Sequence, residues 1–157
     1  MLTSGESLKK RVLVVDDDPA VGQVLNLALA EAGWRVALAN TGAEGWDKVV
    51  SLKPDLIILD LILPDMDGLE ICRRIKTSRE LKKTPVFILS AKTRPEDRAA
   101  GRQAGANQYL TKPFSPEMVV RVVRRYLHRE GKVRRNGDSR EGFSSVGARG
   151  RGFNGDY

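Results

Sequence analysis

Between residues 11 and 128 the chain alternates short apolar runs with longer stretches in which apolar residues recur every three or four positions. A short apolar run indicates a strand covered on both faces, whereas the longer spacing indicates a helix with one buried face. Turn-forming residues separate these segments, as Gly33 does after the first helix. The pattern predicts strands at 12–15, 34–39, 55–60, 85–90 and 107–110, and helices at 19–32, 41–51, 67–78, 94–103 and 114–128.

Five strands that alternate with five helices predict an α/β fold of the doubly wound type, in which a five-stranded parallel sheet carries helices on both faces. In such an open sheet, ligands bind beyond the carboxyl ends of the strands, at the point where the strand order reverses. The residues that directly follow the predicted strands are therefore the first candidates for a functional site.

The net charge of +7 arises from 27 basic and 20 acidic residues and is unevenly distributed. Residues 129–157 hold seven basic and four acidic residues together with seven of the 15 glycines, and their few apolar residues show no period. Such a composition buries too little apolar surface to offset the entropy of ordering the chain. We therefore expect a short extension at 1–9, one domain at 10–128 and a disordered basic tail at 129–157.

The chain has a single cysteine, Cys72, which excludes a framework of disulfides and a cysteine-rich zinc site. No apolar run approaches the roughly 18 residues needed to cross a bilayer, and the first ten residues do not form a signal peptide. We expect a cytoplasmic protein without a membrane partner.

Chemically distinctive residues stand at or just beyond the ends of four of the predicted strands. Asp16 and Asp17 follow the first strand, Asp60 ends the third, Ser90 ends the fourth and Lys112 follows the fifth. Carboxylates that share one crevice repel each other unless a cation joins them, and oxygen ligands of this kind suit Mg²⁺. A divalent ion, an ammonium and a hydroxyl around a carboxylate can stabilise a transferring phosphoryl group. Asp60 would then be the nucleophile, because a carboxylate can form an aspartyl-phosphate.

Four motifs with these spacings, VLVVDDDP, IILDLILPDMDG, FILSA and YLTKPF, resemble the receiver domain of bacterial two-component response regulators. The resemblance covers about 10–128 and implies a flavodoxin-like sheet of order 2-1-3-4-5. It implies that Asp60 accepts a phosphoryl group from a sensor histidine kinase or a phosphotransfer protein. It also implies that Asp17 and Asp60 bind Mg²⁺ directly, that Asp16 does so mainly through water, and that the carbonyl of Ile62 adds a ligand.

The resemblance also assigns roles around the acceptor. Lys112 is similar to the lysine that pairs with the phosphoryl group, and the Lys112–Pro113 bond matches one that is cis in the family. Ser90 resembles the switch hydroxyl, and Tyr109 resembles the aromatic residue that turns inward behind it. Tyr109 also fits the simpler interpretation of a core aromatic. Ile62 stands at a position that guides or blocks the attacking water in the family, so we expect slower hydrolysis of the acyl phosphate than with asparagine there.

We thus expect a stand-alone receiver, similar to the chemotaxis regulators, that is not an enzyme in its own right and signals to an unknown downstream protein. A phosphorylation-dependent homodimer is a further candidate partner. Arg94, Arg98 and Arg102 recur every four residues on one predicted helix, and a basic face of this kind favours an acidic partner surface.

Two alternatives stay open. The Arg/Gly segment with Phe143, Phe153 and Tyr157 resembles sequences that contact single-stranded nucleic acid by charge and stacking, although its four acidic residues make nucleic acid an unexpected partner. Asp16 and Asp18 also form the DxD pattern of haloacid-dehalogenase-type phosphatases. That pattern leaves Asp60, Ser90 and Lys112 unexplained. Otherwise Asp18, followed by Pro19, is expected to be a helix cap.

Overall fold

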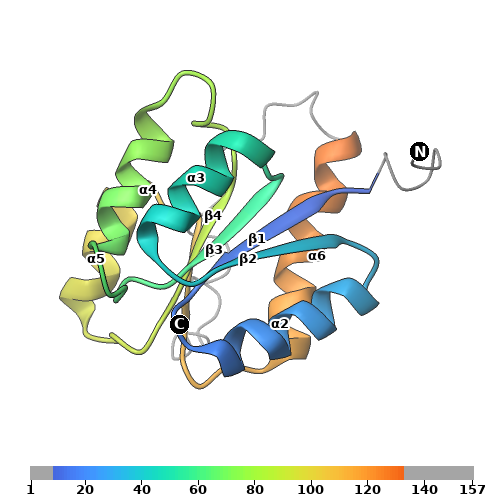
Figure 1. Cartoon of the computed structure of the whole chain (residues 1–157), viewed down its shortest axis with the longest axis horizontal. Helices are drawn as coiled ribbons and strands as arrows, with labels where there is room; N and C mark the ends of the chain where they lie inside the picture. The colour runs from blue at the N-terminus through green and yellow to red at the C-terminus, as the bar shows by residue number, and fades with distance from the viewer. Residues whose placement is uncertain (1–8, 133–157) are drawn as a thin grey trace.

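In the computed structural model, residues 9–132 form a five-stranded parallel sheet enclosed by helices (Figure 1). The strand order is β2-β1-β3-β4-β5, and every neighbouring pair is parallel, so the predicted doubly wound fold is confirmed. The strands are β1 (Arg11–Val15), β2 (Arg35–Ala39), β3 (Leu56–Leu59), β4 (Val86–Ser90) and β5 (Gln108–Thr111). The helices are α2 (Pro19–Glu31), α3 (Gly42–Leu52), α4 (Gly68–Thr77), α5 (Pro95–Gln103) and α6 (Pro116–Lys132).

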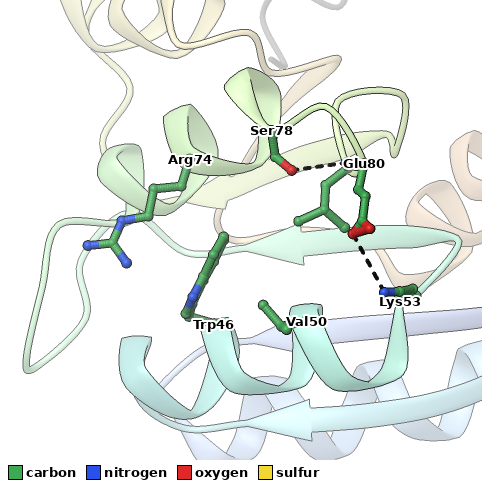
Figure 2. A pocket seen from close by; sticks show the side chains of 7 residues that line it. Trp46, Val50, Lys53, Arg74, Ser78 and Glu80 are labelled. Atoms are coloured by element: carbon green, nitrogen blue, oxygen red, sulfur yellow. Dashed lines mark hydrogen bonds and ion pairs between the residues drawn. The ribbon is translucent and has the colours of Figure 1, made fainter.

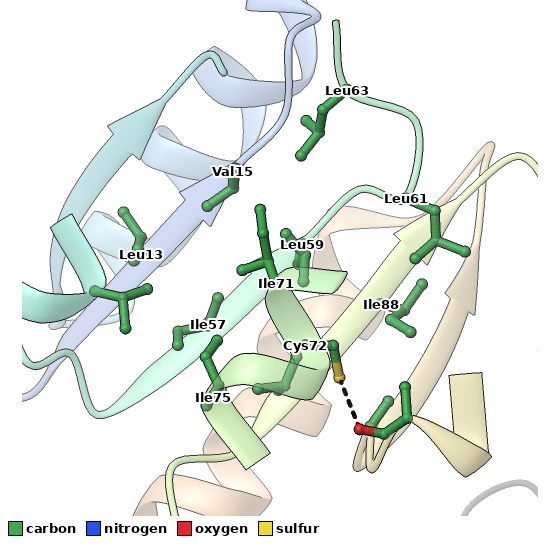
Figure 3. Packing of buried hydrophobic residues seen from close by; sticks show 14 of the residues in the cluster. Leu13, Val15, Ile57, Leu59, Leu61, Leu63, Ile71, Cys72, Ile75 and Ile88 are labelled. Atoms are coloured by element: carbon green, nitrogen blue, oxygen red, sulfur yellow. Dashed lines mark hydrogen bonds between the residues drawn. The ribbon is translucent and has the colours of Figure 1, made fainter. Parts of the chain in front are cut away.

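Two hydrophobic cores lie on opposite faces of the sheet because successive strand residues point to alternate sides. On one face Leu13 and Ile57 pack with residues of α3, α4 and the end of α5 (Figure 3). On the other face Val12 and Ile58 pack with α2 and α6. The central strands β1, β3 and β4 are buried along almost their whole length, which explains why their sequences are apolar without alternation.

Side-chain caps set where several helices begin. Asp18 accepts a hydrogen bond from the amide of Ala20 at 2.9 Å, with Pro19 at the first helical position, which confirms its predicted role as the cap of α2. Thr41 caps α3 and Asp67 caps α4 in the same way. The cap positions of these three helices are therefore held by short oxygen-bearing side chains.

The last helix differs from its predicted range of 114–128. It begins at Pro116, because the hydroxyl of Ser115 accepts the amide of Met118 at 3.1 Å and so caps the first turn. It ends at Lys132, four residues beyond the predicted end, so the helix continues into the first residues of the predicted tail. The predicted disorder of the tail beyond this point concerns residues outside 9–132 and stays a prediction.

Cys72 lies in the core between α4 and the sheet, where it is fully buried and its thiol contacts the carbonyl oxygen of Ala104 at 3.5 Å. Burial raises the pKa of this thiol from 9.0 to about 11. The folded state therefore keeps a proton that the unfolded chain releases above pH 9.

We predict that this proton makes Cys72 a source of alkaline instability. The contribution is fully present below pH 9 and is lost as the pH rises toward 11, by up to about 1.4 kcal/mol per pH unit. Urea unfolding of the parent chain and of Cys72→Ala from pH 8 to 11 measures it. The advantage of the parent over the variant should shrink across this range, and parallel stability curves would contradict the prediction.

Candidate functional site

The residues singled out by the sequence meet at the carboxyl edge of the sheet. Main-chain hydrogen bonds continue the sheet ladder by one residue past the strand ends. The amide of Asp16 donates to Ala39, that of Asp60 donates to Val15, and that of Lys112 donates to Ser90, at 2.9–3.0 Å. Each functional side chain is therefore fixed by the neighbouring strand as well as by its own.

Asp16, Asp17 and Asp60 form an acidic cluster at this edge. One carboxylate oxygen of each lies within 4.8 Å of the others. Asp16 and Asp60 are each only 5% exposed, whereas Asp17 is exposed. Two of the three acids therefore lie at the bottom of the cluster, and the third is open to solvent.

The ammonium group of Lys112 is shared by the two buried acids. Its Nζ lies 2.9 Å from Asp16 Oδ2 and 3.0 Å from Asp60 Oδ2. Burial opposes the charge of Lys112, but the hydrogen bonds to Asp16 and Asp60 outweigh this effect and raise its pKa. Burial also raises the pKa of Asp16, against the opposing influence of Lys112. The lysine is therefore held in its charged form between two carboxylates.

Backbone amides fix the other oxygen of each buried carboxylate. Asp16 Oδ1 accepts the amide of Asp18 at 2.9 Å, and Asp60 Oδ1 accepts the amide of Ile62 at 3.2 Å. With Lys112 on the Oδ2 atoms, both side chains are oriented before any ligand arrives. Such preorganisation is what an electrostatic site requires.

The acidic cluster also fits a divalent metal ion. Three carboxylates face a single ammonium, so the cluster carries excess negative charge in a partly buried setting. Hard oxygen ligands with one open, solvent-facing side suit Mg²⁺, which usually retains several waters. The donor set therefore agrees with the predicted metal site at Asp16, Asp17 and Asp60. The role of the Ile62 carbonyl as a ligand stays a prediction.

Ser90 and Tyr109 are joined through the backbone of Lys92. Ser90 is fully buried, and its hydroxyl oxygen accepts the amide of Lys92 at 3.2 Å. The Tyr109 hydroxyl donates to the carbonyl oxygen of the same residue at 2.7 Å. Ser90 and Tyr109 thus contact the same residue, one at its amide and the other at its carbonyl group.

The Tyr109 ring is turned inward and is 1% exposed, among the core residues that contact α5. Burial, together with the nearby charge of Asp97, raises its pKa to about 12. Gly101 makes room for it, since a Cβ atom there would lie 2.9 Å from the ring and 3.0 Å from Ile88 Cδ1. Tyr109 therefore fits both interpretations of the sequence, a core aromatic and a neighbour of the predicted switch hydroxyl.

Two residues that follow β3, Asp65 and Gly68, hold the site together without joining the cluster. Asp65 accepts the amides of Gly42 and Ala43 at 2.7 and 2.9 Å and so anchors the start of α3. At the first residue of α4, Gly68 lies so close to the backbone of Asp60 that a Cβ atom would collide with its carbonyl oxygen. The Lys112–Pro113 bond is cis, as the resemblance implied.

Three contributors to this site have no role in the sequence-based prediction: Asp65, Gly68 and Gly101. Asp67-Gly68 predicts a helix start, although a glycine directly after a capping acid also permits close packing of backbones. Glycine is unfavourable within a helix, so Gly101 in a helical pattern indicates a packing requirement.

Comparison with known proteins agrees with this geometry. Residues 12–124 match the model of the response regulator receiver domain. The chain belongs to this family. The receiver is 42% identical over 128 residues to the transcriptional regulatory protein TrcR of Mycobacterium tuberculosis, and 39% identical over 123 residues to the DNA-binding master regulator RpaA of Synechocystis. These matches cover 82% and 78% of the chain but 49% and 51% of the relatives, so the receiver spans about half of their length.

Solved structures give the same fold. A CheY-like receiver domain protein of Methanospirillum hungatei superposes with a TM-score of 0.73 at 28% identity, covering 79% of this chain and 98% of that one. Chemotaxis protein CheY4 of Vibrio cholerae gives 0.71 at 33% identity, covering 75% and 98%. The receiver thus belongs to a family of signalling modules of the two-component type, which differs from the family of the phosphatase alternative. Among residues 9–132, no helix has the length and apolar character of a membrane span.

We predict that Gly101→Ala displaces the Tyr109 ring. The added methyl group should cost about 1–3 kcal/mol of stability through overpacking, and the displaced tyrosine should titrate closer to its ordinary pKa of 10. Gly22→Ala in helix α2 is the matched control, because its Cβ would make an ordinary 3.6 Å contact with Leu38 of strand β2. Chemical unfolding and spectrophotometric tyrosine titration measure the two effects. Equal stability of the two variants would show that the space at Gly101 is not required.

Proposed function

We propose that this receiver accepts a phosphoryl group on Asp60 and thereby changes the surface it offers to partner proteins. The observation that carries the proposal is the Lys112 ammonium, which bridges Asp60 and Asp16 beside a third, exposed carboxylate. A structural ion pair would need only one acid. Here three carboxylates face one ammonium at an edge that is open to solvent. This excess of carboxylates suits a site that receives a metal ion and a phosphoryl group.

In this proposal a carboxylate oxygen of Asp60 attacks the phosphorus atom of a phosphohistidine on a histidine kinase or phosphotransfer protein. The phosphorus–oxygen bond forms as the phosphorus–nitrogen bond breaks, and the electron pair returns to the imidazole. Lys112 is placed to neutralise charge on the transferred group, because its ammonium already contacts Asp60. Transfer also removes negative charge from the Asp60 oxygen that held Lys112, so this lysine can follow the phosphoryl group.

Asp16, Asp17 and Asp60 would hold Mg²⁺, with Ile62 supplying a carbonyl oxygen. When bound, the ion would neutralise phosphoryl oxygens. The buried acids Asp16 and Asp60 are already oriented by the amides of Asp18 and Ile62, which lowers the cost of ordering the ligands. The solvent exposure of Asp17 leaves a side on which waters can complete the coordination shell.

Ser90, Lys92 and Tyr109 would carry the signal away from the phosphoryl group. The Ser90 hydroxyl is a donor that a phosphoryl oxygen can attract, and its movement would break the 3.2 Å hydrogen bond from the Lys92 amide. Lys92 also holds the Tyr109 hydroxyl, so the ring and the neighbouring α5 would respond. The surface around α5 and β5 is therefore where we place the response and a phosphorylation-dependent homodimer.

Several partner predictions remain proposals. The relatives named as transcriptional or DNA-binding regulators are about twice the length of the matched region, so the region that this chain matches is shared with proteins that act on DNA. The nucleic-acid alternative for 129–157 and the expectation of a stand-alone receiver concern residues outside those described, and both stay predictions. A cytoplasmic location follows from the proposed encounter with a histidine kinase and stays a proposal with it.

The direct test is incubation with acetyl phosphate and Mg²⁺, followed by mass spectrometry. The parent chain should gain one phosphoryl group at Asp60, and both Asp60→Asn and removal of Mg²⁺ with chelator should abolish the gain. Asp18→Asn is the matched control, because asparagine caps a helix as well as aspartate and Asp18 lies outside the cluster. Modification that persists at the same level in Asp60→Asn would refute the proposal.

The side chain of Ile62 predicts a long-lived phosphorylated state. This residue is 56% exposed beside the acceptor and cannot orient an attacking water. Ile62→Asn should speed hydrolysis by up to about tenfold, the effect of one hydrogen bond of about 1.4 kcal/mol in the transition state. Decay of the phosphorylated protein measures the rate, with Ile62→Val as the apolar control. If the parent decays as fast as Ile62→Asn, the prediction is wrong.

A further inference from the structure

A groove lies between α3 and α4, away from the acidic cluster (Figure 2). Its volume is about 350 Å³, and apolar atoms of Trp46, Val50 and Leu81 form its floor. Lys53 and Arg74 stand at its rim. Val50 is 46% exposed, so the floor is open to solvent. An apolar, aromatic hollow edged by cations is unlike an ordinary solvated helix face.

The chain concentrates positive charge beside this groove. Residues 73–83, which run from the middle of α4 to the loop before β4, contain six basic residues and a single acidic one, Glu80. Arg79, Lys82 and Lys83 in the loop are exposed. The charges of these three loop residues are therefore available to a partner, on the same stretch of chain that supplies Arg74, Ser78 and Leu81 to the groove.

The two cations at the rim, Lys53 and Arg74, form only weak ion pairs with other side chains. Lys53 approaches Glu80 at 3.7 Å, and Arg74 approaches Glu70 at 3.9 Å, with all four side chains at least 45% exposed. Exposed pairs of this kind are worth little, so a better carboxylate partner can replace them. The Arg74 guanidinium also lies 5.4 Å from the centre of the Trp46 ring, which positions it over the groove wall.

The groove lies apart from the proposed phosphoacceptor, because none of its lining residues belongs to the acidic cluster. α4 is ten residues long, or about 15 Å, and its first residue, Gly68, packs on Asp60. Ser78, which follows its last residue, lines the groove instead. A partner in the groove therefore leaves the acidic cluster accessible.

We propose that the groove between α3 and α4 docks an acidic segment of a partner protein, with an apolar side chain in the hollow and flanking carboxylates on Arg74 and Lys53. Tryptophan and arginine are the residues that most often dominate protein interfaces, and here Trp46 lines the hollow with Arg74 beside its ring. The surrounding positive charge would speed association with an acidic partner.

A protein segment fits this surface better than a nucleic acid. The hollow has room for one or two side chains, and one approach to the Trp46 ring is taken by Arg74, which limits base stacking. Glu80 and Glu70 also stand among the cations and would repel a continuous phosphate backbone. Carboxylates spaced along a peptide can contact the cations and avoid these acids.

The test uses the full chain labelled with ¹⁵N and a synthetic peptide in which Asp and Glu flank a central Leu and Phe. Addition of the peptide should shift the Trp46 indole signal saturably and leave the Trp34 indole signal unchanged. Arg74→Glu should weaken binding at least tenfold, and Val50→Asn, at an exposed position, should also weaken it. Arg124→Glu is the matched control, because Arg124 lies 5.4 Å from the Trp34 ring on the other face of the sheet and changes the net charge equally.

Three outcomes would overturn the proposal. The first is the absence of a saturable shift at Trp46, and the second is an equal loss of binding in Arg74→Glu and Arg124→Glu, which would indicate attraction by net charge alone. The third is binding of a thymidine oligonucleotide at the same signals with equal or higher affinity. Phosphorylation of Asp60 from acetyl phosphate is measured in Arg74→Glu as well, and it should match the parent. The two proposals can thus fail separately.

Discussion

The placement of one ammonium group between two buried carboxylates is the interaction on which the site depends. Asp16 and Asp60 come from strands β1 and β3, and Lys112 follows β5, so three separate parts of the chain must arrive at one edge. Buried carboxylates would repel each other strongly without a cation. The parallel sheet makes their meeting possible, because all its strands end on the same side.

Near the same edge, two glycines permit close contacts that a larger residue would prevent. Gly68 lets α4 touch the backbone of Asp60, and Gly101 lets the Tyr109 ring lie inside the core. Glycine within or at the start of a helix sacrifices stability, since alanine would favour the helix by roughly 0.5–1 kcal/mol. At both positions the close contact excludes a larger residue, which explains why the chain accepts this loss.

Much of the fold and the acidic cluster could be predicted from the sequence because both depend on local patterns. Apolar runs such as 12–15 and 55–60 mark buried strands, and residues just beyond parallel strands must share an edge. What could not be predicted depends on contacts between distant segments. The hydrogen bonds that Asp65 accepts from Gly42 and Ala43 across the fold have no local signal in the sequence. The groove escaped notice for the same reason, since Trp46 and Arg74 look like ordinary helix residues until α3 and α4 are side by side.

The loop between β3 and α4 joins these features mechanically. Asp65 accepts hydrogen bonds from the first turn of α3, and Gly68 in the first turn of α4 packs against the backbone of Asp60. Both walls of the groove are therefore tethered at their upstream ends to a single short loop, which carries the aspartate. A shift of that loop would therefore change the distance between α3 and α4, and with it the width of the groove.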